Sequence, residues 1–431
     1  MMRLLMTPEI FKRKTAASLP GRCALVTALG CLAIVLSAGQ SPVAHGQTYT
    51  VLQSFNGANG ANPGYQGSLI LNGSTLYGMT SGGISGNGNI FSINTNGSGF
   101  QNLYSFSSGA DGAGPQGSLT LNGSTLYGMT CYGSGFGNIF SVNTDGSAFQ
   151  SLYQFSGGDG TNPYGSLTLS GSTLYGMTCA GGSNGSGNIF SISTNGAGFQ
   201  NLCSFSGGAD GSYPFGSLAV SGSTLYGMTS AGGNGNGNIF SIGTNGTGLL
   251  SLYAFSGGAD GQWPSGDLTL SGSILYGMTW SGGASGKGNI FSVNTNGTGF
   301  HNLYSFSGGD GANPNGDLVL SGSTLYGMTV NGGSDGDGTI FSINIDGSDF
   351  RSLLSFSGSD GANPYGSLTL NGSTLYGMTS SGGTSNDGVV FSLTTTPEPS
   401  TFVLLSVGAM GLAGCAWRSR QARRRHGDEV R

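Results

Sequence analysis

Five residues, Leu-Tyr-Gly-Met-Thr, occur seven times in this chain at nearly constant spacing. The copies begin 48 to 51 residues apart, at Leu76, Leu126, Leu174, Leu225, Leu275, Leu325 and Leu375. Internal similarity at a fixed period of this length indicates a repeat architecture, in which each unit buries its hydrophobic surface against its neighbours. The sequence therefore predicts seven similar structural units.

The second repeat shows what one unit contains. Gly117–Leu121 alternates apolar and polar residues, which is the period of a half-buried strand, and the Asn122-Gly123 pair after it predicts a tight hairpin turn. Three further strands are predicted at Ser124–Thr130, Asn138–Asn143 and Phe149–Phe155. Four short antiparallel strands in about 50 residues are typical of a propeller blade with a kelch-like period. We expect an all-β, seven-bladed β-propeller over residues 47–396; a parallel β-helix is the alternative.

The two ends of the repeat region predict how the ring closes. Tyr49–Phe55 matches the fourth strand of a repeat, as in Gln101–Phe106. The last repeat has three strands, predicted at Gly366–Leu370, Ser373–Thr379 and Val389–Leu393, and stops before a fourth. We expect the N-terminal strand to complete the last blade, because closure removes the unpaired strand edges that invite aggregation.

Charge is distributed unevenly along the chain. Between Gln47 and Thr396 there are 14 Asp and no Glu, against the basic residues Lys287 and Arg351, a formal charge of −12. Nucleic-acid binding needs clustered Lys and Arg side chains. The acidic body therefore argues against a nucleic-acid partner.

The first 46 residues have the organisation of an export signal. Basic residues up to Arg22 precede the apolar run Cys23–Ala38, and a small-x-small site, Ala44-His45-Gly46, follows. This order is typical of a secretory signal peptide. We predict cleavage after Gly46; an uncleaved membrane anchor is the alternative.

The C-terminal residues 397–431 contain a second apolar run. Pro397-Glu398-Pro399 precedes Thr401–Trp417, which is just long enough for a transmembrane helix over residues 401–417. An arginine cluster follows and would stay cytoplasmic by the positive-inside rule: Arg418, Arg420, Arg423, Arg424 and Arg425. The repeat region would then lie outside the cytoplasmic membrane, in agreement with the export signal.

The repeat itself resembles a known family. The pattern Gly-Ser-Leu-x-Leu-x-Gly-Ser-Thr-Leu-Tyr-Gly-Met-Thr, followed by Gly-Asn-Ile-Phe-Ser-Ile-Asn-Thr-Asn-Gly and Asn-Leu-Tyr-Ser-Phe, looks like the GloVer tandem repeat of bacterial envelope proteins. The resemblance covers nearly all of residues 47–396, with Thr339 and Val389 in place of the Asn. It implies a fold and a location, and it carries no catalytic residues.

The C-terminal pattern resembles the PEP-CTERM sorting signal. This resemblance implies that an exosortase reads Pro397, Glu398 and Pro399 after membrane insertion, and that cleavage occurs near them. It also implies delivery to the cell surface or extracellular matrix of a Gram-negative bacterium that makes exopolysaccharide. The alternative is a plain C-terminal membrane anchor.

Catalytic and redox chemistry have few candidate residues. His301 is the one histidine of the body and begins a fourth strand, where other repeats carry Gln, Leu or Arg. Poised acids and bases are therefore scarce, and the sequence predicts a non-enzymatic protein; a polysaccharide lyase or hydrolase is the alternative. Cys131 and Cys179 occupy equivalent places in neighbouring repeats, so they either pair or serve as small buried residues.

An acidic residue recurs between the repeats, in the pattern Asp-Gly-x-x-Pro. Either these carboxylates make turn hydrogen bonds or they form a ring that binds cations or sugar hydroxyls. The six are Asp111, Asp159, Asp210, Asp260, Asp310 and Asp360, and Asn59 replaces them in the first copy.

Two other loop features could bind ligands. Asp335-Gly336-Asp337-Gly338 has the oxygen-rich composition of a calcium loop without the full ligand series, and we expect no other cofactor. Aromatic residues in the loops between repeats could stack on sugars: Tyr65, Tyr164, Tyr213, Phe215, Trp263 and Tyr365. We therefore expect an exported, non-enzymatic surface or matrix protein that associates with exopolysaccharide or with other surface proteins.

Overall fold

The structure is a computed structural model that describes residues 47–83, 85–133 and 135–395. The predicted signal peptide and the predicted sorting signal, including its helix over residues 401–417, lie outside the described residues. The described part consists of strands β1 to β30 and contains no helix. It accordingly offers no helix that could cross a membrane.

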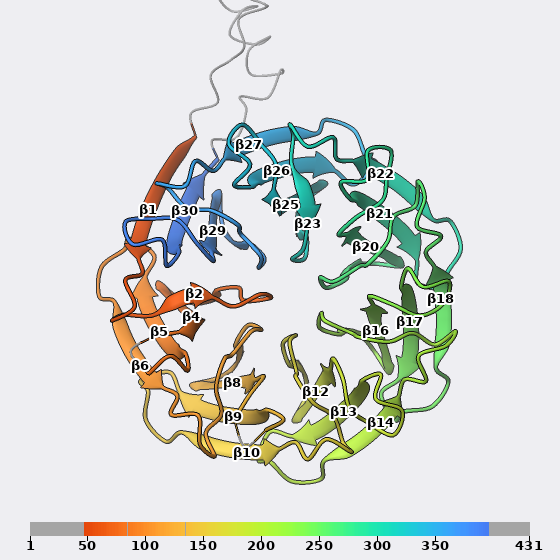
Figure 1. Cartoon of the computed structure of the whole chain (residues 1–431), viewed down its shortest axis with the longest axis horizontal. Coiled ribbons are helices and arrows are strands. Elements are labelled where there is room, and N and C mark those ends of the chain that lie inside the picture. The colour runs from red at the N-terminus through yellow and green to blue at the C-terminus, as the bar shows by residue number, and fades with distance from the viewer. Residues whose placement is uncertain (1–46, 84, 134, 396–431) are drawn as a thin grey trace, which may run out of the picture. The chain divides into compact units, whose positions relative to one another are not determined.

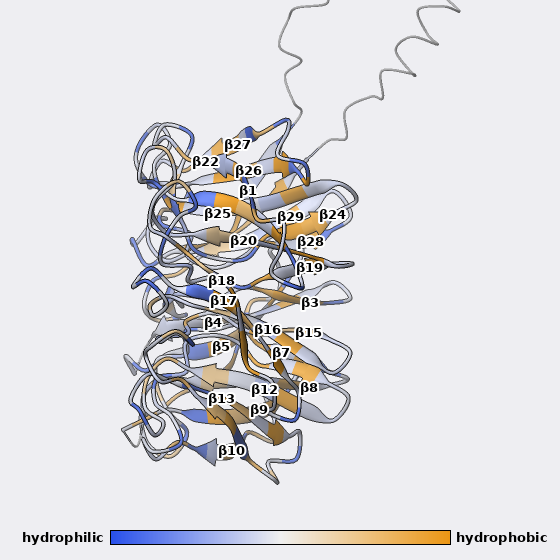
Figure 2. Cartoon of the chain, turned by 90° about the vertical axis from the view of Figure 1, so that its right-hand side faces the viewer, coloured by the Kyte–Doolittle hydropathy of each residue, from blue (hydrophilic) through white to orange (hydrophobic). Residues whose placement is uncertain are grey.

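Seven antiparallel sheets are arranged around a common axis, as the sequence predicts (Figure 1). Each sheet is one blade, numbered here by the Leu-Tyr-Gly-Met-Thr copy that it contains. Within a blade the first strand of the repeat is innermost and the fourth is outermost. Seen edge-on, the hydrophobic stretches lie along the strands of the ring (Figure 2).

The strand bounds repeat closely from blade to blade. Blades 1 to 3 consist of β3 (Ile70–Asn72), β4 (Thr75–Gly82), β5 (Asn89–Asn94), β6 (Gln101–Ser105); β7 (Thr120–Asn122), β8 (Thr125–Thr130), β9 (Asn138–Asn143), β10 (Gln150–Gln154); β11 (Thr168–Ser170), β12 (Thr173–Thr178), β13 (Asn188–Ser193), β14 (Gln200–Ser204). Blades 4 and 5 consist of β15 (Ala219–Ser221), β16 (Thr224–Thr229), β17 (Asn238–Gly243), β18 (Leu250–Ala254); β19 (Thr269–Ser271), β20 (Ile274–Thr279), β21 (Asn289–Asn294), β22 (His301–Ser305). Blades 6 and 7 consist of β24 (Val319–Ser321), β25 (Thr324–Asn331), β26 (Thr339–Asn344), β27 (Arg351–Ser355); β28 (Thr369–Asn371), β29 (Thr374–Thr379), β30 (Val389–Thr394), β1 (Thr48–Ser54).

The predicted closure of the ring is confirmed. Strand β1 pairs with β30 from Thr48 opposite Thr394 to Ser54 opposite Val389 and so becomes the outer strand of blade 7 (Figure 1). Phe55, the next residue, is fully buried between blades 7 and 1. The first and last repeats are therefore joined through the N-terminal strand, and no blade lacks its fourth strand.

The Leu-Tyr-Gly-Met-Thr copies form the second strand of every blade and build the core between blades. In β8, Leu126 packs toward blade 1, whereas Tyr127 and Met129 pack toward blade 3. Gly128 faces the ring of Phe140 so closely that a Cβ there would lie 2.5 Å from the Phe140 Cζ. Each contact between neighbouring blades is thus a packed layer in which Gly is required opposite Phe.

The first strand is shorter than predicted. The prediction placed it at Gly117–Leu121 in the second repeat, but β7 begins only at Thr120. The residues before it bond to the next blade: Ser118 N donates to Ser166 Oγ at 2.7 Å, and a Cβ on Gly117 would lie 2.2 Å from the Gly165 carbonyl oxygen. Contacts around the axis therefore replace the expected pairing within the sheet.

Two strands were not predicted from the sequence. They are β2 (Ala61–Pro63) and β23 (Ala312–Pro314), which pair with β4 and β25. Both belong to links, the name used here for the segments that run from the outer strand of one blade to the inner strand of the next. Other links pair with the residues that follow the second strand through an isolated β-bridge, such as Thr161 opposite Ala180. The links and the loops between second and third strands therefore lie on one face of the ring, called here the link face.

Candidate functional site

The six recurrent carboxylates serve as acceptors inside their own links. Asp111 accepts hydrogen bonds from Ser107 N at 2.8 Å, Ser107 Oγ at 2.7 Å and the Tyr104 hydroxyl at 3.2 Å. Partial burial would raise the pKa of Asp111, but the hydrogen bonds from Ser107 and Tyr104 together outweigh it, and the pKa is lowered. The other five accept the same serine N–H, as Asn59 accepts that of Asn56: Asp159, Asp210, Asp260, Asp310 and Asp360. The turn interpretation thus has a direct structural basis, and cation binding stays a prediction.

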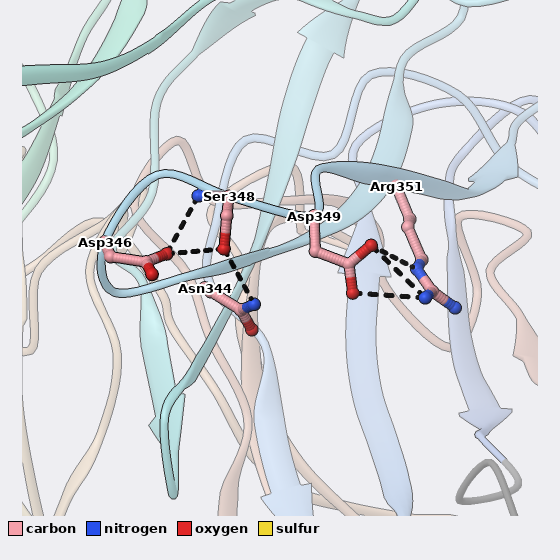
Figure 3. A network of polar contacts seen from close by, with 5 residues as sticks. All are labelled: Asn344, Asp346, Ser348, Asp349 and Arg351. Carbon is pink, nitrogen blue, oxygen red and sulfur yellow. Dashed lines mark hydrogen bonds and ion pairs between the residues drawn. The ribbon is translucent and has the colours of Figure 1, made fainter. Parts of the chain in front are cut away.

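Four additional acidic residues of blade 6 do not gather at one place. Asp335 accepts from Ser334 Oγ at 2.8 Å, and the Asp337 carbonyl accepts from Asn363 N at 2.8 Å. On the opposite face, Asp346 and Asp349 bond to Ser348 and Arg351 (Figure 3). Among the described residues, no three His, Cys, Asp or Glu side chains gather as metal ligands. Calcium binding by Asp335 and Asp337 stays a prediction.

Cys131 and Cys179 are both buried and carry free thiols in this structure. The Cys131 thiol donates to the Pro163 carbonyl at 2.9 Å, across the boundary between blades 2 and 3. Burial raises the pKa of Cys131 well above its ordinary value, and the neighbouring Cys179 raises it further. The two residues behave as small buried groups here, and neither is a poised nucleophile.

His301 lies in a shallow cavity of about 430 Å³ between blades 5 and 6. Ser292 and Asp346 line the same cavity. His301 pairs with Ser292 through the strand backbone, but within the described part no side-chain hydrogen bond joins it to Ser292 or Asp346, and the Asp346 carboxylate instead accepts from Ser348. The side chains of a Ser-His-Asp set are therefore near one another but not coupled in the way nucleophilic catalysis requires.

The centre of the link face is occupied by an insertion in the first repeat. The other repeats have one residue between the link proline and the following Gly-Ser or Gly-Asp pair, whereas Pro63 is followed by Gly64 and Tyr65 before the equivalent Gln66. Tyr65 N donates to Gln116 Oε1 at 2.8 Å, and the Tyr65 carbonyl accepts from Asn315 Nδ2 at 2.9 Å. These bonds fix the insertion to blades 2 and 6, so the extra residues lie over the axis.

A second hydrogen bond from a side-chain amide holds the insertion from across the ring. Gln66 Nε2 donates to the Ser265 carbonyl at 2.9 Å, although 199 residues separate them. Gln66 and Asn315 are both buried, at 6% and 1% exposure, so their amides act where water does not compete. Buried and satisfied amides of this kind hold the centre of the face in one arrangement.

Aromatic rings from several blades meet at this insertion. The Tyr65 ring centroid lies 4.8 Å from that of Tyr365 and 6.4 Å from those of Tyr164 and Phe215. Trp280 lies parallel to Tyr365, with 6.4 Å between centroids. Burial raises the pKa of Tyr65 to about 12, with a smaller contribution from Tyr365, so its hydroxyl stays protonated at physiological pH. The structure thus brings together four of the six predicted aromatics and adds Trp280.

The aromatic cluster opens into a cavity of about 210 Å³ between blades 4 and 5. Its walls are Tyr65, Phe215, Ser230, Trp263, Ser265 and Trp280. Both tryptophans of the described residues belong to it, and Trp263 is 46% exposed. The cavity combines flat apolar surface with serine hydroxyls and contains no charged side chain. We call it the axial pocket.

Trp263 holds a backbone conformation that bulky residues avoid. Its φ is 55°, and the equivalent residues of the other links are Asn62, Gly114, Asn162, Tyr213, Asn313 and Asn363, all with positive φ. Asn and Gly tolerate this left-handed region, whereas an aromatic residue there is a genuine outlier. Such strain persists where the surrounding structure enforces it, and it concentrates at functional sites. Tyr213 and Trp263, in neighbouring blades and both 46% exposed, are the two aromatic exceptions.

Two carboxylates interrupt a ring of serines near the axis. Ser68, Ser118, Ser166, Ser217 and Ser367 occupy one position in five blades, where Asp267 and Asp317 stand in blades 5 and 6. Both residues are only half-buried, but the surrounding protein atoms still remove much of the water from their carboxylates. Burial raises the pKa of Asp317 well above its ordinary value, and Asp267 raises it further. Burial likewise raises the pKa of Asp267, against the hydrogen bonds from Ser217.

Replacing Asp317 with Ser should stabilise the ring in a pH-dependent way. Folding raises the pKa of this carboxyl, so its contribution to stability is fully present only below its unfolded pKa of about 4, where the carboxyl is protonated. That stabilising contribution is lost as pH rises through the folded pKa and the buried group ionises. We expect the gain from Asp317→Ser to be small at pH 4 and to reach about 0.5–2 kcal/mol at pH 8. Urea unfolding of both proteins at the two pH values measures it; an equal gain at both would contradict the ionisation argument.

Comparison with known proteins identifies the repeats. A family model described as the Gloeobacter/Verrucomicrobia repeat matches residues 42–240, 85–288 and 231–412. The chain belongs to the Gloeobacter/Verrucomicrobia repeat family. This confirms the predicted GloVer resemblance across all seven blades, while the comparison leaves the PEP-CTERM resemblance a prediction. No curated protein matches the chain significantly.

Solved structures similar to this member of the repeat family have diverse functions. A chain of a nidogen/laminin complex is 16% identical, with a TM-score of 0.41 over 59% of this chain and 84% of the other. A puromycin-hydrolyzing peptidase of Mycobacterium tuberculosis is 12% identical, with a TM-score of 0.46 over 79% and 53%. TolB from Acinetobacter baumannii is 10% identical, with a TM-score of 0.36 over 76% and 79%. Structural similarity with TM-scores of 0.46 or lower gives no information about function.

Several residues of the site were not singled out in the sequence. Tyr65 was predicted as a loop aromatic, but the insertion of which it is part, the tryptophan at position 280 and the Asp267–Asp317 pair were not, and all three break the repeat pattern. Aligning the seven copies column by column would have revealed each of them, because a departure from a repeated residue is visible without a structure. Their convergence on the axis becomes visible only in the ring.

Proposed function

We propose that this protein is an exported, non-enzymatic surface or matrix protein whose propeller binds carbohydrate through its link face. The proposal rests on the axial pocket: two tryptophans and two further rings converge beside serine hydroxyls at one place in a sevenfold ring. Aromatic faces beside hydroxyl groups suit sugars, because a sugar ring has both apolar C–H faces and polar edges. A concave, largely apolar site with a few polar groups is the usual form of a binding site.

Composition supports a binding role over catalysis. The body contains one histidine, one lysine and no glutamate, and the pocket walls carry no titratable group other than the Tyr65 hydroxyl. Glycoside hydrolysis ordinarily uses a pair of carboxylic groups flanking the scissile bond. The axial pocket has no such pair on its walls.

A glycan array probed with residues 47–396, with and without calcium, tests this function. We expect retention of one or more bacterial or plant-type polysaccharides and no release of reducing ends or unsaturated products. Product release would establish the enzymatic alternative. Absence of binding to every glycan would overturn the carbohydrate role.

Export and sorting are tested separately in the native host. Changing Pro397 and Pro399 together to Ala should leave full-length protein in the cytoplasmic membrane, because the exosortase would lose its Pro-Glu-Pro motif. Membrane fractionation followed by blotting measures this. Normal release of the double variant would refute exosortase sorting, and a Ser400→Ala variant serves as the control that should mature normally.

A further inference from the structure

We propose that the axial pocket binds a neutral saccharide unit, one per propeller, held by stacking on Trp263 and Trp280 and not by charge. This inference rests on the proposed carbohydrate function and specifies its ligand and its site. It depends on three features of the pocket: its size, its unused hydrogen-bonding groups and its electrostatic surroundings.

The size of the pocket fits a single sugar unit. At about 210 Å³ it is smaller than the roughly 300–1,000 Å³ typical of pockets for drug-sized ligands. Trp263, which stands at the rim with 46% exposure, and the half-buried Trp280 both come from blade 5. Tyr65 reaches the pocket from blade 1, so the site exists once although the blades are seven. One ligand per ring is therefore expected.

The pocket presents hydrogen-bonding groups that the protein does not use. Within the described residues, neither indole N–H of Trp263 and Trp280 has a hydrogen-bond partner, so both donors are available to sugar hydroxyls. Ser230 Oγ donates to the Tyr213 carbonyl at 2.9 Å and Ser265 Oγ to Asn315 Oδ1 at 2.8 Å. Each serine oxygen keeps lone pairs that can accept from a ligand.

Charge selects against acidic polysaccharides. The body carries a formal charge of −12, which repels polyanions. Neither basic side chain of the body lines the pocket: Arg351 pairs with Asp349 on the opposite face, and the Lys287 side chain extends toward Gly308 of the next link. An acidic sugar would therefore enter without a compensating cation, at an energetic cost that a neutral sugar does not meet.

The repeats supply substitutions that the fold already accepts. Trp263→Asn and Trp280→Ser place residues that other blades carry at the same positions. Tyr213→Asn is the matched control, because Tyr213 has the same left-handed backbone and exposure as Trp263 but does not line the pocket. In the next link, Asn313 occupies the equivalent position and its Nδ2 donates to the Trp280 carbonyl at 3.0 Å. An Asn at position 213 or 263 should therefore gain a comparable hydrogen bond.

The experiment is calorimetric titration of residues 47–396 with cello-oligosaccharides and dextran as neutral probes and alginate as the acidic probe. We expect one site per protein for a neutral probe, affinity that changes less than twofold between 50 and 500 mM NaCl, and no alginate binding. Trp263→Asn and Trp280→Ser should each weaken binding at least tenfold, whereas Tyr213→Asn should leave it unchanged. Trp263→Asn and Tyr213→Asn should both raise the unfolding midpoint, which separates loss of the site from loss of the fold.

Other outcomes overturn the inference in distinguishable ways. Salt-sensitive binding of alginate, or neutral binding that survives both tryptophan substitutions, would refute the neutral axial site while leaving carbohydrate binding intact. Several equivalent sites per ring would show that the seven links bind instead. Failure to bind any glycan in the array would remove the proposed function together with this inference.

Discussion

Deleting residues 48–55 should reduce the free energy of unfolding by more than about 5 kcal/mol. The deletion removes the outer strand of blade 7 and the fully buried Phe55. Loss of a buried Phe side chain alone costs about 3–5 kcal/mol, and each lost strand hydrogen bond adds roughly 1 kcal/mol. Urea unfolding of residues 47–396 with and without the strand measures the difference.

A milder pair of variants covers the case in which the deletion does not fold. Phe55→Ala should destabilise by about 3–5 kcal/mol, because Phe55 packs edge-on against both Phe91 and Phe100 at the closing boundary. Val51→Ala in the same strand should change little, since Val51 is 37% exposed. Equal, small effects of both substitutions, or a deletion that unfolds like the parent, would mean that β1 does not close the ring.

Gly277→Ala should destabilise the propeller by about 1–3 kcal/mol through overpacking. Gly277 is the glycine of the fifth Leu-Tyr-Gly-Met-Thr copy, and a Cβ there would lie 2.5 Å from the Phe291 Cζ. The Phe291 ring cannot withdraw easily, because it stacks on Phe300 at 5.6 Å and meets Phe255 edge-on at 5.4 Å. Thermal or urea unfolding measures the loss.

Gly309→Ala is the matched control for this substitution. Gly309 lies in the next link, its φ is not in the left-handed region, and nothing lies within 4 Å of a Cβ added there. By restricting the unfolded chain, this change should stabilise by about 0.4–1 kcal/mol. If Gly277→Ala behaves like Gly309→Ala, the second strand does not need its glycine for packing against Phe291.

The repeated motif predicts the blades well because its requirements are local. Alternation of Leu126 with Tyr127 and Met129 decides which side chains face which neighbouring blade, and the hairpin glycines decide where strands turn. The bounds of β8, β9 and β10 accordingly lie within a residue of the predicted strands. The first strand was predicted too long, because Gly117 and Ser118 bond to the next blade and alternation cannot reveal bonds between blades.

The sequence by itself determined the number of blades, most of their strands and the closure by the N-terminal strand, because each of these follows from period, alternation and turn chemistry within about 50 residues. Tertiary structure alone decided where a ligand could bind. Tyr65, Phe215 and Trp280 stand far apart in the chain, and only ring closure brings them to one pocket. The physical reason is that sevenfold packing makes the link centres converge on the axis, where a two-residue insertion and two tryptophans break the symmetry once.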